Sequence, residues 1–165
     1  MLPQSLIRIS GMTLHDSGTS NIKIPTTDDE LHFVSTEDGT VSLKSSKFDE
    51  SFHCLSGAKK EAQEKFINPS QLALDYTDRS LFVLDVCIGM GYNTASLMES
   101  LIGKHIALNW WGLEIDKRPL QLALSNKKFL AKWPNEIIND LFSLEKQNHF
   151  STKFNEGKIL WGDAR

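Results

Sequence analysis

Two kinds of hydrophobic spacing divide the first half of the chain. In 31-LHFVSTEDGTVSLKS-45, two β-prone runs surround Asp38 and Gly39, and an Asp-Gly pair between such runs predicts a hairpin. From Ser56 the spacing is helical: 56-SGAKKEAQEKFI-67 places small and aromatic residues on one face until Asn68-Pro69 stops the helix. A second short helix is expected at about 70–77.

Strand and helix patterns alternate in the second half. The continuous apolar run Leu81 to Val86 is typical of a strand covered on both faces, as in a parallel sheet. A helical pattern then ends at Gly103, and a strand follows around 106–115. A helix opened by Pro119 and extending to Leu130, a helix over 134–147 and a strand over 158–162 complete the pattern. This alternation predicts an α/β domain with a parallel sheet.

Three segments are expected along the chain: an irregular N-terminal arm over 1–30 with room for one short strand, a hairpin and helical extension over 31–80, and the α/β unit over 81–165. The 165 residues suit a single globular unit. No apolar run approaches the roughly 20 residues of a membrane helix, and no signal-peptide core is present, so a cytoplasmic location is expected. Cys54 and Cys87 lack metal-ligand spacing, so no metal is expected.

The segment 81-LFVLDVCIGMGYNTASLM-98 carries the main candidate site. At the carboxyl end of a parallel strand, backbone N–H groups of a turn and the following helix point outward together and bind an anion. Gly89 and Gly91 suit such a turn because they tolerate positive φ and carry no side chain. A tight turn without a ligand remains an alternative. A dehydrogenase is disfavoured, because Thr94 stands where the dinucleotide fingerprint needs its third glycine.

A second candidate group follows the next strand, in 111-WGLEID-116. A carboxylate there can accept hydrogen bonds from both hydroxyls of a ribose. Glu114 is the predicted ribose acceptor. Asp116 is the alternative, although a helix N-terminal charge ahead of Pro119 is the favoured interpretation of this residue.

The pattern Asp-x-Cys-x-Gly-x-Gly that begins at Asp85 resembles motif I of the Rossmann-like class I methyltransferases, which bind S-adenosylmethionine. It departs from many of them at Cys87, where they have glycine. The segment 159-ILWGDAR-165 is similar to their third strand, after which an acid accepts from the adenine amino group. The resemblance implies these cofactor-binding residues: Asp85, Cys87, Gly89, Gly91, Asn93, Glu114, Asp163 and Ala164.

Further residues resemble one methyltransferase family, the MnmC-like tRNA-modifying enzymes, over about residues 30–165. Outside the generic motifs, the resemblance is carried by Phe52, His53, Gly57, Ala58, Glu61 and Ala62. It implies methylation of an aminomethyl group on the wobble uridine of tRNA, with a separate oxidoreductase as the source of that group. No catalytic residue is assigned, and a structural role is favoured for His53 over a catalytic one.

Class I methyltransferases have seven strands, so the chain resembles the front half of such a domain, truncated after the third strand. Two hypotheses follow: an enzyme whose remaining half is missing or lies on another chain, or a truncated, non-catalytic remnant that binds the cofactor or a protein partner only. In the usual strand order, this truncation would leave Leu81–Val86 as an exposed sheet edge prone to self-association. The 165 residues alone are expected to be catalytically inactive for a separate reason, because the acceptor pocket would lack its downstream wall.

Overall fold

A computed structural model describes residues 6–10, 29–70 and 80–163 of the chain, the first of these ranges as backbone only. The helix expected at about 70–77 lies outside the described residues except for its first position, and so does the candidate residue Ala164. Within those residues, no helix is long and apolar enough to cross a membrane.

A small antiparallel sheet precedes the main fold. It contains β2 (Leu31–Ser35), β3 (Val41–Ser45) and β4 (Glu50–Ser51), with β2 and β3 joined as the predicted hairpin. In its turn, a carboxylate oxygen of Asp38 accepts from the backbone N–H of Thr40 at 2.9 Å and from the hydroxyl of Thr36 at 2.8 Å. Burial alone would raise the pKa of Asp38, but these hydrogen bonds lower it to about 2.

The same turn fixes the start of the first helix, α1 (Ala58–Ala62), which continues as a π-helical segment, η1 (Gln63–Ile67). The Ala58 N–H donates to Thr40 Oγ1 at 3.1 Å, and the Lys60 N–H donates to Asp38 Oδ2 at 3.2 Å. Side chains of the hairpin therefore cap this helix, which otherwise has unpaired N–H groups in its first turn. The helix predicted over 56–67 is confirmed, as a combination of α-helical and π-helical turns.

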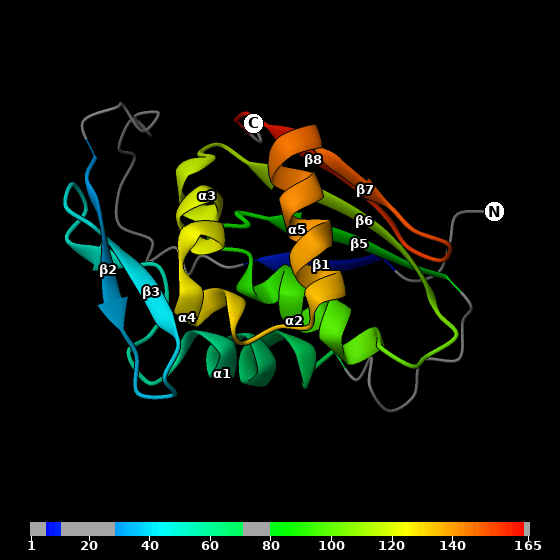
Figure 1. Ribbon diagram of the computed structural model, residues 1–165, viewed down its shortest axis with the longest axis horizontal. Coiled ribbons are helices and arrows are strands. Elements are labelled where there is room, and N and C mark those ends of the chain that lie inside the picture. Colours follow the sequence, from blue (N-terminus) through cyan, green and yellow to red (C-terminus); the bar gives the residue numbers. More distant parts are fainter. Residues whose placement is uncertain (1–5, 11–28, 71–79, 164–165) are drawn as a thin grey trace.

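The main sheet has the order β1-β5-β6-β8-β7 (Figure 1). Its three predicted strands are confirmed as β5 (Ser80–Val86), β6 (Ala107–Glu114) and β8 (Glu156–Trp161), paired in parallel in that order. The helix α2 (Tyr92–Leu101) follows β5, as the sequence predicted. The mixed α/β class with a parallel sheet is thus confirmed.

The N-terminal arm contains one short strand, for which the sequence left room, but its position in the sheet was not predicted. This strand, β1 (Leu6–Ser10), pairs in parallel with β5 along its length, from Leu6 opposite Phe82 to Ser10 opposite Val86. The expectation that β5 forms an exposed edge is therefore wrong, because backbone groups of the N-terminal arm occupy that edge (Figure 1). At the other side of the sheet, β7 (His149–Ser151) pairs antiparallel with β8.

Three helices separate β6 from β7: α3 (Arg118–Ser125), α4 (Lys127–Leu130) and α5 (Asn135–Gln147). The single helix predicted from Pro119 to Leu130 is divided at Asn126. The side-chain oxygen of Asn126 accepts from the Lys128 N–H at 2.9 Å, so this residue begins α4 as its N-cap instead of continuing α3. The helix predicted at 134–147 is confirmed.

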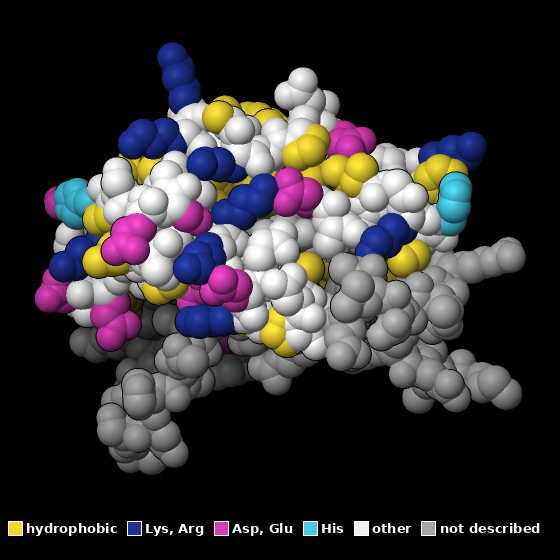
Figure 2. Space-filling view, turned by 90° about the horizontal axis from the view of Figure 1, so that it is seen from below, with side chains coloured by type: hydrophobic (Ala, Val, Ile, Leu, Met, Phe, Trp, Pro, Cys, Tyr) yellow, Lys and Arg dark blue, Asp and Glu magenta, His cyan; other side chains and the backbone are white. Residues whose placement is uncertain are grey.

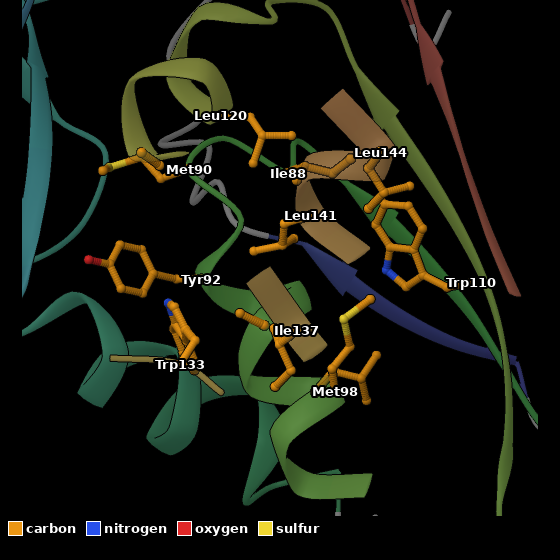
Figure 3. Close-up of a cluster of buried hydrophobic side chains, with 14 of the residues drawn as sticks. Ile88, Met90, Tyr92, Met98, Trp110, Leu120, Trp133, Ile137, Leu141 and Leu144 are labelled. Atoms are coloured by element: carbon orange, nitrogen blue, oxygen red, sulfur yellow. The ribbon is translucent and has the colours of Figure 1, made fainter. Parts of the chain in front are cut away.

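The core lies against one face of the main sheet, which α5 crosses in Figure 1. Leu81, Val83 and Asp85 of β5 are buried there, beside the buried Trp110 of β6. Figure 3 shows Trp110 beside side chains of α2 and α5. Positions on the opposite face are less covered, and Trp111 is 47% exposed. The prediction that β5 is covered on both faces is therefore met in full on one face and in part on the other, where its residues are of intermediate burial.

Candidate functional site

The connection from β5 to α2 is built almost entirely from left-handed backbone. Cys87, Gly89 and Gly91 have φ angles of 64°, 57° and 85°. Such angles are ordinary for glycine but uncommon for other residues, so Cys87 adopts a backbone conformation that glycine reaches more easily. The N–H of Cys87 donates to the carbonyl of Leu113 on β6 at 2.9 Å, which fixes the start of the turn.

Glu114, the last residue of β6, binds the glycine turn through its carboxylate. Oε2 accepts from the Gly89 N–H at 2.8 Å, while Oε1 accepts from the N–H groups of Ile115 at 2.7 Å and Asp116 at 3.0 Å. A carboxylate has about four acceptor positions, so these bonds leave room for roughly one more. The predicted contact with both ribose hydroxyls would therefore require the Gly89 bond to open.

Asp85 lies directly beneath the turn and is fully buried. Its Oδ2 accepts from the hydroxyl of Thr94 at 2.6 Å, whereas Oδ1 has no hydrogen-bond partner. Burial and the charge of Glu114 raise the pKa of Asp85 to about 7, against the hydroxyl of Thr94 and the indole of Trp110, which lower it. Thr94, which interrupts the dinucleotide fingerprint, thus serves as a donor to the motif's acid.

The N-terminal extension covers the turn from outside. A β-carbon built on Gly89 would lie 3.4 Å from the ring of Phe52, so this aromatic ring lies against the glycine. The neighbouring His53 shares a hydrogen bond of 3.1 Å with Ser42 Oγ, and its ring packs edge-on against Tyr92. Burial lowers the pKa of His53 to about 4, although nearby carboxylates oppose this. These contacts support the structural role favoured for His53.

The remaining candidate residues lie around the same end of the sheet. Asn93 is buried in the first turn of α2. Asp163 is exposed just beyond β8, and the N–H of the preceding Gly162 donates to the Glu114 carbonyl at 2.8 Å. Asp116 accepts from the Arg118 N–H at 2.9 Å, in agreement with its predicted role at a helix N-terminus. The described residues contain no group of three or more His, Cys, Asp or Glu that could hold a metal.

The parallel order of the sheet brings three segments to one edge: the glycine turn after β5, Glu114 at the end of β6 and Asp163 after β8. The sequence selected all three. It gave no role to Thr94 or Trp110, which come near Asp85 only when the strands and α2 pack together. The sequence did give one indication of Thr94, because a polar residue stands there in place of the third glycine of the dinucleotide fingerprint.

Comparison with known proteins shows that this fold resembles that of a solved structure. The crystal structure of MnmC2 from Aquifex aeolicus superposes with a TM-score of 0.64 and 24% identity, over 84% of this chain and 44% of that one. The uncharacterized protein MJ0670 of Methanocaldococcus jannaschii is 43% identical over 71 residues, which are 43% of this chain and 19% of that protein. No protein-family model matches the chain. The chain spans less than half of either protein and shares with MnmC2 a Rossmann-like α/β fold.

Proposed function

We propose that this chain is part of an S-adenosylmethionine-dependent methyltransferase that acts on the aminomethyl group of wobble uridine in tRNA. The observation that carries the proposal is the convergence of the glycine turn, Glu114 and Asp163 at one edge of a parallel sheet. Ligands of open α/β sheets bind at the carboxyl ends of the strands. The sequence resemblance and the fold shared with MnmC2 support the methyltransferase class.

The residues present fit an adenosine-containing cofactor. A β-carbon on Gly89 would meet only the ring of Phe52 within 4 Å, so the missing side chain leaves no bulk on the turn except that ring. Glu114 retains acceptor capacity for about one ribose hydroxyl. Asp163 and the backbone of Ala164 are the proposed partners of the adenine. Asn93 and Cys87 complete the proposed set from the turn.

The bound cofactor would supply an electrophilic methyl group on a sulfonium, so the protein needs no nucleophilic side chain. What it must do is hold a neutral amine in line with the methyl–sulfur bond and exclude water, and positioning of this kind contributes several kcal/mol, of the order of 7 to 11 in favourable cases. The turn, anchored by Glu114 and Asp85, provides a rigid base for that alignment. Phe52, which lies against Gly89, limits access from the side of the N-terminal extension.

The tRNA acceptor is proposed from resemblance and not from charge. The net charge is −3, and Figure 2 shows basic and acidic side chains interspersed on the face it presents. Lys59 pairs with Glu99 at 2.8 Å, and Lys65 pairs with Glu61 at 2.6 Å, which reduces the field of these lysines. A separate oxidoreductase that produces the aminomethyl group is the proposed partner, and the cytoplasm the proposed location.

Two experiments test this function. Titration calorimetry with S-adenosylmethionine is expected to show binding that Gly89→Val abolishes, because a branched side chain would strain the left-handed backbone and collide with Phe52. Gly103→Val is the matched control, since Gly103 also has positive φ but lies away from the turn, with nothing within 4 Å of an added β-carbon. Equal loss in both variants would contradict the site.

The second experiment tests the acceptor. In tRNA from a deletion strain, the unmethylated aminomethyl nucleoside should accumulate, as detected by mass spectrometry. An unchanged nucleoside profile would reject the acceptor.

A further inference from the structure

Two buried polar atoms beneath the glycine turn have no hydrogen-bond partner: Oδ1 of Asp85 and Nε1 of Trp110. One is an acceptor and the other a donor. They belong to neighbouring parallel strands, with Trp110 opposite Val83 and Asp85 opposite Gly112, and both side chains lie on the buried face of the sheet. Unpaired buried polar atoms are rare and costly, so a complementary pair in one region calls for an explanation.

The placement of the indole ring makes the pairing specific. A β-carbon built on Gly112 would collide with Cη2 of Trp110 and lie 2.9 Å from Cζ2, so the ring lies over this glycine. Within the indole, Cζ2 is bonded to the carbon that carries Nε1. The N–H edge of the ring therefore lies near Gly112, which is the residue paired with Asp85 on the neighbouring strand. Ile88 of the glycine turn also lies over Gly112, because its Cδ1 would be 2.5 Å from that β-carbon.

We propose that Trp110 is a positioning residue for the glycine turn, in which its indole N–H is the second donor to the Asp85 carboxylate. Thr94 is the first donor, through its hydroxyl on α2. Together the two donors hold the carboxylate between the turn, α2 and β6 and favour its ionised form. Gly112 is required because any side chain there would displace the ring.

Charges around Asp85 make this second donor important. Among the described residues, Glu114 is the charged group that acts on Asp85, and its effect is to raise the pKa of the carboxyl, together with burial. Thr94 and Trp110 act in the opposite direction. Because the carboxyl titrates near neutral pH, loss of one donor would change its charge where the protein works. This consequence for affinity rests on the proposed function, since S-adenosylmethionine is a cation and an ionised Asp85 attracts it.

The pairing can be tested without any cofactor. The chain has four tryptophans, so a ¹H–¹⁵N spectrum contains four indole N–H signals, and Trp110→Phe identifies the one in question. We expect this signal to shift with pH with a midpoint near the pKa of Asp85, and to become independent of pH near neutrality in Asp85→Asn. The Trp133 signal is the internal control, because this indole N–H is also buried without a partner but packs against Tyr92 and Phe129. A Trp110 signal that does not titrate, or titrates equally in Asp85→Asn, would overturn the proposal.

A second measurement separates positioning from simple packing. In Trp110→Phe, the pKa of Asp85 is expected to rise by about half a unit or more, as followed by the ¹³C signal of its carboxyl. Affinity for S-adenosylmethionine should then fall about twofold or more near pH 7, in proportion to the ionised fraction of Asp85, and recover at pH 9, where the carboxyl is ionised in both proteins. Trp133→Phe should leave the pH profile unchanged. Equal weakening by Trp110→Phe at all pH values would assign Trp110 to packing alone. If wild type fails to bind, the proposed function fails while the spectroscopic pairing still stands.

Discussion

Glu114→Gln is the most direct test of how the turn is anchored. Glutamine has nearly the shape of glutamate but only one acceptor oxygen. If that oxygen keeps the N–H groups of Ile115 and Asp116, the new NH₂ group faces the N–H of Gly89, donor against donor. The opposite orientation keeps Gly89 and loses the other two. The cheaper arrangement therefore leaves one partly buried N–H without its acceptor.

The cost of that lost acceptor is about 1 to 3 kcal/mol of folding free energy. For a protein of this size, 1 kcal/mol lowers the melting temperature by roughly 2 to 4 °C, so a decrease of roughly 2 to 12 °C is expected. The same loss frees the turn from β6. If the cofactor needs the turn as it stands here, its affinity should fall roughly 5- to 150-fold over the same range of free energy.

Thermal unfolding followed by circular dichroism, and calorimetry with S-adenosylmethionine, measure the two effects. Glu156→Gln is the control: Glu156 begins β8 of the same sheet but is exposed, and its substitution should change the melting temperature by no more than a degree or two. A Glu114→Gln protein as stable as wild type would show that the three hydrogen bonds contribute nothing to the turn. Unchanged affinity despite lower stability would remove Glu114 from the cofactor site.

Three further predictions concern the elements around the site. Asp38→Asn should lower stability at neutral pH by about 1 to 3 kcal/mol and flatten its acid dependence, because the lowered pKa of Asp38 gives stability that is present above pH 4 and lost as pH falls toward 2; urea unfolding at several pH values measures this. Gly57→Ala should destabilise more than Gly103→Ala in the same assay, because a β-carbon at Gly57 would collide with the Asp38 carboxylate, whereas Gly103 faces nothing within 4 Å; equal costs would mean that backbone strain alone matters. Deletion of residues 1–10 should raise the oligomer size seen by light scattering, because β5 loses its parallel partner; an unchanged monomer would contradict the role of β1 as an edge cover.

Sequence patterns predicted the elements that carry strong periodicity and the residues that end them. The apolar run of β5 and the glycines after it located the turn, and the acid after β6 located Glu114, because these signals are local. The bond from Glu114 to Gly89 joins residues 25 positions apart and depends on the pairing of β5 with β6. Its consequence, a carboxylate with most of its acceptor positions already used, could not be seen in the sequence.

Errors in the predicted fold occurred where signals were short or ambiguous. Asn126 lies within an apolar spacing that continues to Leu130, so helical periodicity alone did not show that its side chain begins a new helix. β7 has three residues, too few for alternation to be recognised. On the outer face of the sheet, Trp111 and Leu160 are 47% and 44% exposed, which their hydrophobic type alone does not indicate.

At the edge of β5, the rule that exposed strand edges self-associate was correct, but it was applied without knowledge of β1. An apolar strand without proline, lysine or a bulge is a poor edge, and the sequence analysis concluded that it would self-associate. The structure meets the same requirement differently: β1 pairs with β5 from Leu6 to Ser10, and β5 becomes an interior strand between β1 and β6. This pairing joins segments far apart in the chain, and five residues in a polar arm carried too little pattern to reveal it.

The glycine turn begins at the end of β5, and β5 has a hydrogen-bonded neighbour on both sides. Removing β1 should therefore loosen the turn as well as expose the edge, so the deletion of residues 1–10 should increase hydrogen exchange at Cys87 and Gly89 even in the fraction that stays monomeric. Exchange that rises only in the associated fraction would limit β1 to covering the edge.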